Sequence, residues 1–290
     1  MTTNTRNSGT DSGNGGRTVL VTSGTGKTGR RVVERLRESG LDVRSGSRGA
    51  GDVRFDWDDP STWEPALTGA DAAYVAYYPD LAAPTAPDAL RELGRIAARC
   101  AVREVVLLSG RGEPEAVVAE RALREAADGV VVTVVRAAFF AQNFSEGPLA
   151  EGLATGELVF PAGRTAEPFV DADDLADVVV AVLAGDGQRG GVHEVTGPRP
   201  LTFDEVAAEL SRATGRAVRY VPVTPEQYAA ALEGFGMPRG EAVWLAELFG
   251  TLLDGHNSST TEGVKQVLGR DPKDFAEFAD GAAAAGVWGA

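Results

Sequence analysis

The stretch Ser23-Gly24-Thr25-Gly26-Lys27-Thr28-Gly29 holds residue types that bind phosphate groups, and it permits two interpretations. Gly24 to Gly29 fit G-x-G-x-x-G, the turn of a dinucleotide-binding unit, whereas Gly26-Lys27-Thr28 resembles the end of a nucleotide-triphosphatase loop. The triphosphatase loop needs a glycine five residues before Gly26, and that position is Val21. Val21 belongs to an apolar run that is typical of a buried parallel strand. The sequence therefore favours dinucleotide binding, and only the triphosphatase interpretation requires the Lys27 ammonium on the phosphates.

A helix is expected directly after this turn, because Val32, Val33 and Leu36 fall at helical spacing. Gly29 would let this helix pack close to the sheet, with a pyrophosphate at its N-terminus. The predicted cofactor-binding residues of the turn are Gly24, Thr25, Gly26, Lys27, Thr28 and Gly29.

Strands and helices alternate from Arg17 onward, which predicts an α/β fold with a doubly wound parallel sheet of the Rossmann type. The expected strands are Val19–Val21, Asp42–Ser45, Val53–Phe55, Ala73–Tyr77, Glu104–Ser109, Val130–Arg136 and a segment near His193–Val195. The expected helices begin at Thr28, at Asp59-Pro60, at Asp88 and at Glu115.

Three segments are predicted along the chain. Residues 1–16 are polar and are expected to form a disordered tail. Residues 17–198 form the predicted Rossmann core, and residues 199–290 a smaller, mostly helical lobe on the substrate side. Capping-box spacings at Thr202/Glu205 and Thr224/Gln227 support helices in this lobe.

Composition excludes several classes of function. The 290 residues include 28 Lys plus Arg and 42 Asp plus Glu, a formal charge of −14, which argues against nonspecific nucleic-acid binding. No apolar run reaches the ~20 residues of a membrane span, and the N-terminus lacks a signal-peptide core, so we expect a cytoplasmic protein. One cysteine and two distant histidines predict neither a disulfide nor a metal site. Homo-oligomerisation is left open.

The chain resembles NmrA-like members of the atypical short-chain dehydrogenase/reductase superfamily from about residue 17 to 281. The stretches that carry this resemblance are TSGTGKTGR, VRSGSR, FDWDDPSTWEPALTGADAAYV, REVVLLSG, VVRAAFFAQNF, PFVDADDLADVV, HEVTGPRPLTFDEVA and VLGRDPKDFAEFA. The usual turn of this family is G-x-x-G-x-x-G, and here Ser23 replaces the first glycine. A serine fits such a turn if its φ angle stays negative.

The resemblance implies an NADP(H) cofactor in preference to NAD(H). Arg48 closes the second strand where an acidic residue would bind an NAD ribose, and a guanidinium suits a 2′-phosphate, although a solvated arginine is the alternative. Asp56 and Trp57 match the adenine-side loop of the family; otherwise they are a loop carboxylate and a core aromatic residue.

The ends of the later strands carry the other candidate site residues. Tyr77, Tyr78 and Ser109 lie at the carboxyl edge of the sheet, where ligands bind in such folds. In this family, the stretch with Phe139, Phe140 and Asn143 lines the nicotinamide and substrate pocket, although both phenylalanines also suit a plain core. Trp244 and Phe249 are candidates for the pocket from the C-terminal lobe.

The Tyr-x-x-x-Lys pair of mainstream short-chain dehydrogenases is missing, because tyrosines occur only at 74, 77, 78, 220 and 228 and lysines only at 27, 265 and 273. The corresponding helix offers Glu120 and Arg121 instead. Two functions stay open: NADPH-dependent reduction of a quinone-like or conjugated small molecule, and a noncatalytic NADP-binding redox sensor. The apolar pocket predicted near Phe139 favours the enzyme, with the hydroxyls of Tyr78 and Ser109 as its candidate catalytic helpers.

Overall fold

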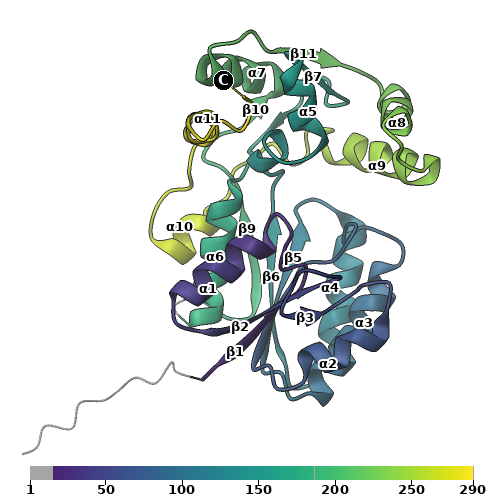
Figure 1. Ribbon diagram of the computed structural model, residues 1–290, viewed down its shortest axis with the longest axis vertical. Coiled ribbons are helices and arrows are strands. Elements are labelled where there is room, and N and C mark those ends of the chain that lie inside the picture. Colours follow the sequence, from purple (N-terminus) through teal and green to yellow (C-terminus); the bar gives the residue numbers. More distant parts are fainter. Residues whose placement is uncertain (1–15, 186, 290) are drawn as a thin grey trace, which may run out of the picture.

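The computed structural model describes residues 16–185 and 187–289, and its centre is a seven-stranded parallel sheet with the strand order β3-β2-β1-β4-β5-β6-β9 (Figure 1). These strands are β1 (Thr18–Val21), β2 (Asp42–Ser47), β3 (Val53–Arg54), β4 (Ala72–Val75), β5 (Glu104–Gly110), β6 (Val131–Ala137) and β9 (Gly191–Val195). The strand order reverses between β1 and β4, and ligands of doubly wound sheets bind at the carboxyl ends of the strands beside such a switch point. The predicted Rossmann fold is confirmed.

Helices cover both faces of this sheet, because its central strands are apolar on both sides. Figure 1 shows α1 (Gly29–Glu38), α6 (Ala172–Ala184) and α10 (Gly263–Leu268) on one face. The opposite face carries α2 (Trp63–Leu67), which follows the 3-10 turn η1 (Pro60–Thr62), and then α3 (Ala86–Arg99) and α4 (Pro114–Ala126). Each face has its own hydrophobic core, one around Leu36 and Val179 and the other around Leu90 and Leu123.

A second lobe lies beyond the carboxyl ends of the strands (Figure 1). Its elements are η2 (Ala141–Phe144), α5 (Pro148–Ala154), β7 (Glu157–Phe160), β8 (Ala166–Glu167), β10 (Leu201–Thr202), α7 (Phe203–Thr214), β11 (Arg219–Pro222), α8 (Pro225–Gly234), α9 (Arg239–Leu252) and α11 (Phe275–Ala284). Two short sheets join distant segments, since β7 pairs with β11 and β8 pairs with β10. Phe203 stacks on Phe160 with 5.0 Å between the ring centroids, and both rings are buried.

Packing crosses the predicted boundary at residue 198. The core of the second lobe contains Phe144, Leu158 and Phe169 from before this boundary, together with Leu210 and Phe278 from after it. The short helix α10 belongs to the later segment of the chain, yet it packs on α6 and β9 of the Rossmann core. The second lobe is therefore formed by two segments of the sequence.

Local sequence signals agree with the observed elements. Thr202 and Thr224 each form the expected capping box at the start of α7 and α8. Asp59 caps the 3-10 turn η1, which precedes the regular helix expected there. The predicted disordered tail lies outside the described residues, apart from Gly16. In the described part of the chain, no helix is long and apolar enough to cross a membrane, and no group of side chains has the makeup of a metal site.

Candidate active site

The glycine-rich turn joins β1 to α1, and two of its glycines are required for close packing. A Cβ atom on Gly29 would collide with the carbonyl oxygen of Ser23, and one on Gly24 would collide with the Ser45 hydroxyl. Backbone hydrogen bonds fix the turn, from Gly26 N to Ser23 O at 2.8 Å and from Gly24 N to Gly46 O at 2.9 Å. The first turn of α1 therefore lies directly against the end of β1.

Gly26 has a different role, because its exposed side is nearly open. A Cβ atom there would meet Ser23 O at 3.1 Å and little else. The N-terminus of α1 also lacks a side-chain cap, since the Thr28 hydroxyl accepts a hydrogen bond from Tyr74 Oη at 3.0 Å. With no acidic residue in its first turn, this helix end fits the pyrophosphate of a dinucleotide.

Ser23 does not meet the condition of a negative φ angle. Its φ angle is 50°, in the left-handed region that glycine adopts at no steric cost. The turn requires that conformation, because the Ser23 carbonyl must face Gly26 and Gly29. The Ser23 hydroxyl donates a hydrogen bond to Ala76 O at 3.0 Å, which offsets part of the strain and anchors the turn to the segment after β4.

The residues predicted to bind the adenine side of a dinucleotide lie beside the ends of β2, β3 and β4. Arg48 follows β2 directly, is exposed and lies over the ring of Tyr78, with 5.6 Å between its Cζ atom and the ring centroid. Asp56 and Trp57 follow β3, and Trp57 Nε1 donates a hydrogen bond to Ala76 O at 3.1 Å. The Trp57 ring packs edge-on against Tyr77, with 4.7 Å between centroids. These aromatic rings form a wall next to the turn.

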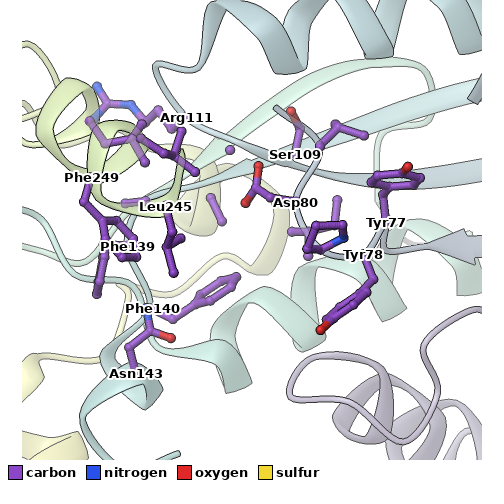
Figure 2. Close-up of a pocket in the computed structure, with 18 of the residues that line it drawn as sticks. Tyr77, Tyr78, Asp80, Ser109, Arg111, Phe139, Phe140, Asn143, Leu245 and Phe249 are labelled. Atoms are coloured by element: carbon purple, nitrogen blue, oxygen red, sulfur yellow. The ribbon is translucent and has the colours of Figure 1, made fainter. Parts of the chain in front are cut away.

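A cavity of about 640 Å³ opens at the carboxyl ends of β4, β5 and β6 and extends under α9. Figure 2 shows Phe139, Leu245 and Phe249 on one side of it and Tyr77 and Tyr78 on the other. The sequence-predicted residues that line this cavity are Lys27, Tyr77, Tyr78, Ser109, Phe139, Phe140, Asn143, Trp244 and Phe249. Gly24 and Thr25 line a separate hollow beside β2, together with Ser45 and Gly51.

The hydroxyls of Ser109 and Tyr78, the candidate catalytic helpers, differ in burial and in hydrogen bonding. Ser109 is buried, and its hydroxyl donates to Glu120 Oε1 at 2.7 Å. Arg136 donates hydrogen bonds of 2.7 and 2.8 Å to the same Glu120 carboxyl group, which fixes the group that binds the Ser109 hydroxyl. Tyr78 is 60% exposed at the mouth of the cavity, and its hydroxyl has no hydrogen-bond partner among the described residues.

A pair of carboxyl groups near the cavity was not predicted. Asp80 lines the cavity after β4, as Figure 2 shows, and it interacts with Glu113, which is buried against Gly110. Burial and the nearby Asp80 carboxylate raise the pKa of Glu113 to about 9, and burial raises the pKa of Asp80. The pair therefore holds a proton at neutral pH. Asp80 lies near the end of a strand, which could have indicated it, but Glu113 has no such signal.

Glu167 is a second buried carboxyl group at the cavity that sequence reasoning missed. One of its oxygens accepts a hydrogen bond from Phe139 N at 3.3 Å, and Oε2 has no partner among the described residues. Burial raises the pKa of Glu167 to about 7, although the positive charge of Arg111 opposes the shift. Arg111 in turn donates to Asn257 O at 2.7 Å. Glu167 and Phe139 are 28 positions apart and Arg111 and Asn257 are 146 positions apart, so no local pattern indicates these contacts.

We expect Gly26→Val to abolish dinucleotide binding while the protein stays folded. The added side chain has room in the protein but would occupy the open side of the turn, where a pyrophosphate would lie. Titration of NADPH fluorescence measures the binding, and circular dichroism reports the fold. Gly281→Ala, at an exposed position of α11 with no atom within 4 Å of its Cβ, controls for the loss of a glycine. Normal NADPH binding by Gly26→Val would refute the dinucleotide role of the turn.

Glu113→Gln should stabilise the protein at alkaline pH. The folded-state pKa of Glu113 lies above its ordinary value, so the folded protein retains a proton that the unfolded chain releases. Stability is therefore lost as pH rises from about 5 to 9, and the neutral glutamine avoids this loss. We expect the free energy of unfolding at pH 9 to rise by about 1–3 kcal/mol and the difference to disappear near pH 4. Urea titrations at both pH values measure it, with the exposed Glu125→Gln as the control.

Comparison with known proteins places the chain in a family. Residues 117–279 match the model of the NmrA-like family. An NAD(P)H azoreductase from Xenophilus azovorans is 33% identical over 289 residues, which cover 92% of this chain and 98% of that protein. Prestalk A differentiation protein A from Dictyostelium discoideum is 30% identical over 278 residues, covering 90% and 91% of the two chains.

Solved structures agree with the fold. The structure of an NADPH-dependent quinone oxidoreductase from Escherichia coli, complexed with NADPH, superposes with a TM-score of 0.75. The two chains are 21% identical, and the match covers 91% of this chain and 99% of the other. The matched family model and the near full-length relatives show that this chain belongs to the NmrA-like family.

Proposed function

We propose that this protein uses NADPH to reduce a conjugated small molecule, quinone-like or aromatic, without a Tyr-x-x-x-Lys pair. At the coarser level the chain is an NAD(P)H-dependent reductase, in agreement with its family and with the azoreductase relative, which matches it over nearly its whole length. The acceptor class and the preference for NADPH are the parts that we propose here.

The observation that carries this proposal is the continuity of the glycine-rich turn with the cavity. Lys27 belongs to the turn and also lines the cavity, so a dinucleotide held at the turn extends toward it. The opposite wall is apolar and aromatic, formed mainly by Phe139, Trp244, Leu245 and Phe249. A cavity with apolar walls and few polar groups suits a flat conjugated ring and excludes water from it. A redox sensor would not need such a substrate chamber.

The chain's own residues would act mainly by holding the acceptor in place. When bound, the cofactor supplies a hydride. The rings of Phe139 and Phe249 pack together with 5.9 Å between their centroids and form an apolar surface against which the acceptor would pack. Orientation of two reactants can lower the activation free energy by roughly 7 to 11 kcal/mol. A delocalised acceptor can hold the added electron pair before a proton is transferred to it. With hydride supplied by the cofactor and orientation by the protein, the reaction does not require the tyrosine acid of a Tyr-x-x-x-Lys pair.

Arg48 supports the choice of NADPH over NADH. It directly follows β2, is exposed, and makes no ion pair among the residues that the structure describes. Its contact with the Tyr78 ring leaves the guanidinium hydrogens free to bind a 2′-phosphate. An acidic residue at this position would repel that phosphate.

Arg48→Ala should weaken NADPH binding by about ten-fold or more and leave NADH binding nearly unchanged, because charge-assisted hydrogen bonds contribute roughly 1.5 to 3 kcal/mol. Fluorescence titration with both cofactors measures the effect. Arg95→Ala, an exposed change on α3, is the matched control. Equal losses for the two cofactors would contradict a 2′-phosphate role for Arg48.

A panel of acceptors tests the reaction itself. With NADPH, we expect a benzoquinone, an azo dye and a conjugated enone to be reduced faster than saturated ketones, because only the conjugated acceptors delocalise the electrons. Cofactor oxidation at 340 nm and product analysis measure turnover. Preference for saturated ketones would refute the proposal, whereas tight NADPH binding with no oxidation on any acceptor would favour the redox sensor.

A further inference from the structure

Lys27 is part of the glycine-rich turn, but its side chain extends away from the turn. It lines the cavity, and its Nζ atom donates a hydrogen bond to Asn143 Oδ1. Asn143 lies on η2 and is itself held by a backbone hydrogen bond from its N–H to Phe140 O at 3.0 Å. Figure 2 shows the Asn143 amide beside Phe140 at the edge of the cavity. The ammonium therefore lies where the turn meets the substrate chamber.

The environment of Lys27 differs from that of the other two lysines. Lys265 pairs with Asp271 at 3.0 Å and Lys273 with Asp173 at 3.7 Å, whereas Lys27 makes no ion pair among the described residues. The nearby Glu146 is already engaged by Arg30 at 2.6 Å and Arg31 at 2.7 Å. Asn143, a neutral acceptor, takes one of the three ammonium hydrogens, which leaves the others for a ligand.

We infer that Lys27 is the proton donor to the reduced acceptor and that Asn143 positions its ammonium. This inference rests on the proposed reductase function and supplies the acid that the missing tyrosine–lysine pair leaves unassigned. It differs from the phosphate-binding role that the triphosphatase interpretation would give to Lys27.

The step balances as follows for a conjugated carbonyl acceptor. The acceptor gains a hydride at one end of its conjugated system, and the displaced electron pair moves to the carbonyl oxygen at the other end. The Lys27 Nζ–H bond breaks and an O–H bond forms on that oxygen, which leaves Lys27 as a neutral amine. Water returns a proton to the amine through the open mouth of the cavity. The net reaction consumes one NADPH and one proton per acceptor reduced.

The charges around Lys27 agree with this role. Burial lowers the pKa of its ammonium to about 8, the Glu146 carboxylate opposes the shift, and Arg31 and Arg30 add to it. An ammonium with this pKa is still largely charged at neutral pH, yet it is a far better acid than an ordinary lysine. The other titratable groups on the cavity wall are Asp58, Tyr77, Tyr78, Asp80, Arg111, Glu167 and Glu241.

Lys27→Gln and Lys27→Arg separate proton donation from charge. Glutamine can still hydrogen-bond to Asn143 but has no acidic proton, and arginine keeps the charge but is too weak an acid. We expect both variants to lower kcat for a benzoquinone by about 10²-fold, a typical effect of losing a general acid. The NADPH Kd, measured by fluorescence titration, should change by less than about three-fold in Lys27→Gln. The surface change Lys265→Gln is the matched control, with unchanged kcat.

The pH dependence gives a second readout. In the wild type, kcat should fall above about pH 8 as Lys27 loses its proton, and this decline should be absent from Lys27→Gln. Asn143→Asp places a carboxylate beside the ammonium, so it should move the decline upward by about one pH unit or more. Glu113→Gln and Glu167→Gln should keep the decline, which separates it from the titration of the buried carboxyl groups.

A direct titration of the protein without cofactor does not depend on turnover. Reductive methylation with ¹³C-formaldehyde labels the three lysines, and Lys27→Gln identifies the Lys27 signal. We expect Lys27 to titrate near pH 8, well below Lys265, whose pairing with Asp271 raises its pKa. Titration of Lys27 above pH 10, full activity in Lys27→Arg, or a loss of NADPH affinity in Lys27→Gln as large as the loss of kcat would each overturn the inference. If the wild type reduces the quinone and Lys27→Gln does so equally well, the reductase function stands and only the role of Lys27 fails.

Discussion

Gly29 lies against the carbonyl oxygen of Ser23, at a distance that leaves no space for a side chain. This contact holds the first turn of α1 against the end of β1 and forces Ser23 into a left-handed conformation. The same geometry leaves Gly26 open and the helix N-terminus uncapped, which creates a place for an anionic ligand. Lys27 follows Gly26 directly, so the packing of the turn also sets the direction of the Lys27 side chain. This side chain points toward Asn143 and the cavity.

Burial favours the neutral form of the carboxyl groups and of the lysine at the cavity. It raises the pKa values of Glu113 and Glu167 and lowers the pKa of Lys27, so each group moves toward its neutral form. A cavity with such groups carries less charge at neutral pH than its residue types suggest. It would therefore take up the neutral conjugated acceptor that we propose at a lower desolvation cost, and would keep protons within reach of an anion formed during reduction.

Signals in the sequence predicted the strands, the covering helices and the turn, because hydrophobic periodicity and turn-forming residues are local features. The apolar strand Val19–Val21 and the capping boxes at Thr202 and Thr224 are examples that the structure confirms. Most of the site's aromatic residues were also indicated, since they follow strand ends. The Lys27–Asn143 contact spans 116 positions, and Glu167, which lines the cavity, lies on β8, which pairs with the distant β10. Such contacts arise from tertiary packing and leave no local pattern.

The second lobe explains why substrate specificity is harder to deduce than cofactor binding. Its aromatic core combines Phe144 and Phe160 with Phe203 and Phe249, so the chamber wall and the lobe's stability share the same rings. A change at Phe139 or Phe249 would alter both, whereas Trp244 and Leu248 line the cavity from α9 outside the most buried part of that core. Substitutions on this face of α9 can therefore reshape the cavity proposed to bind the acceptor at low cost in stability, while the glycine-rich turn keeps its geometry. Acceptor choice can thus vary independently of the cofactor site within one fold.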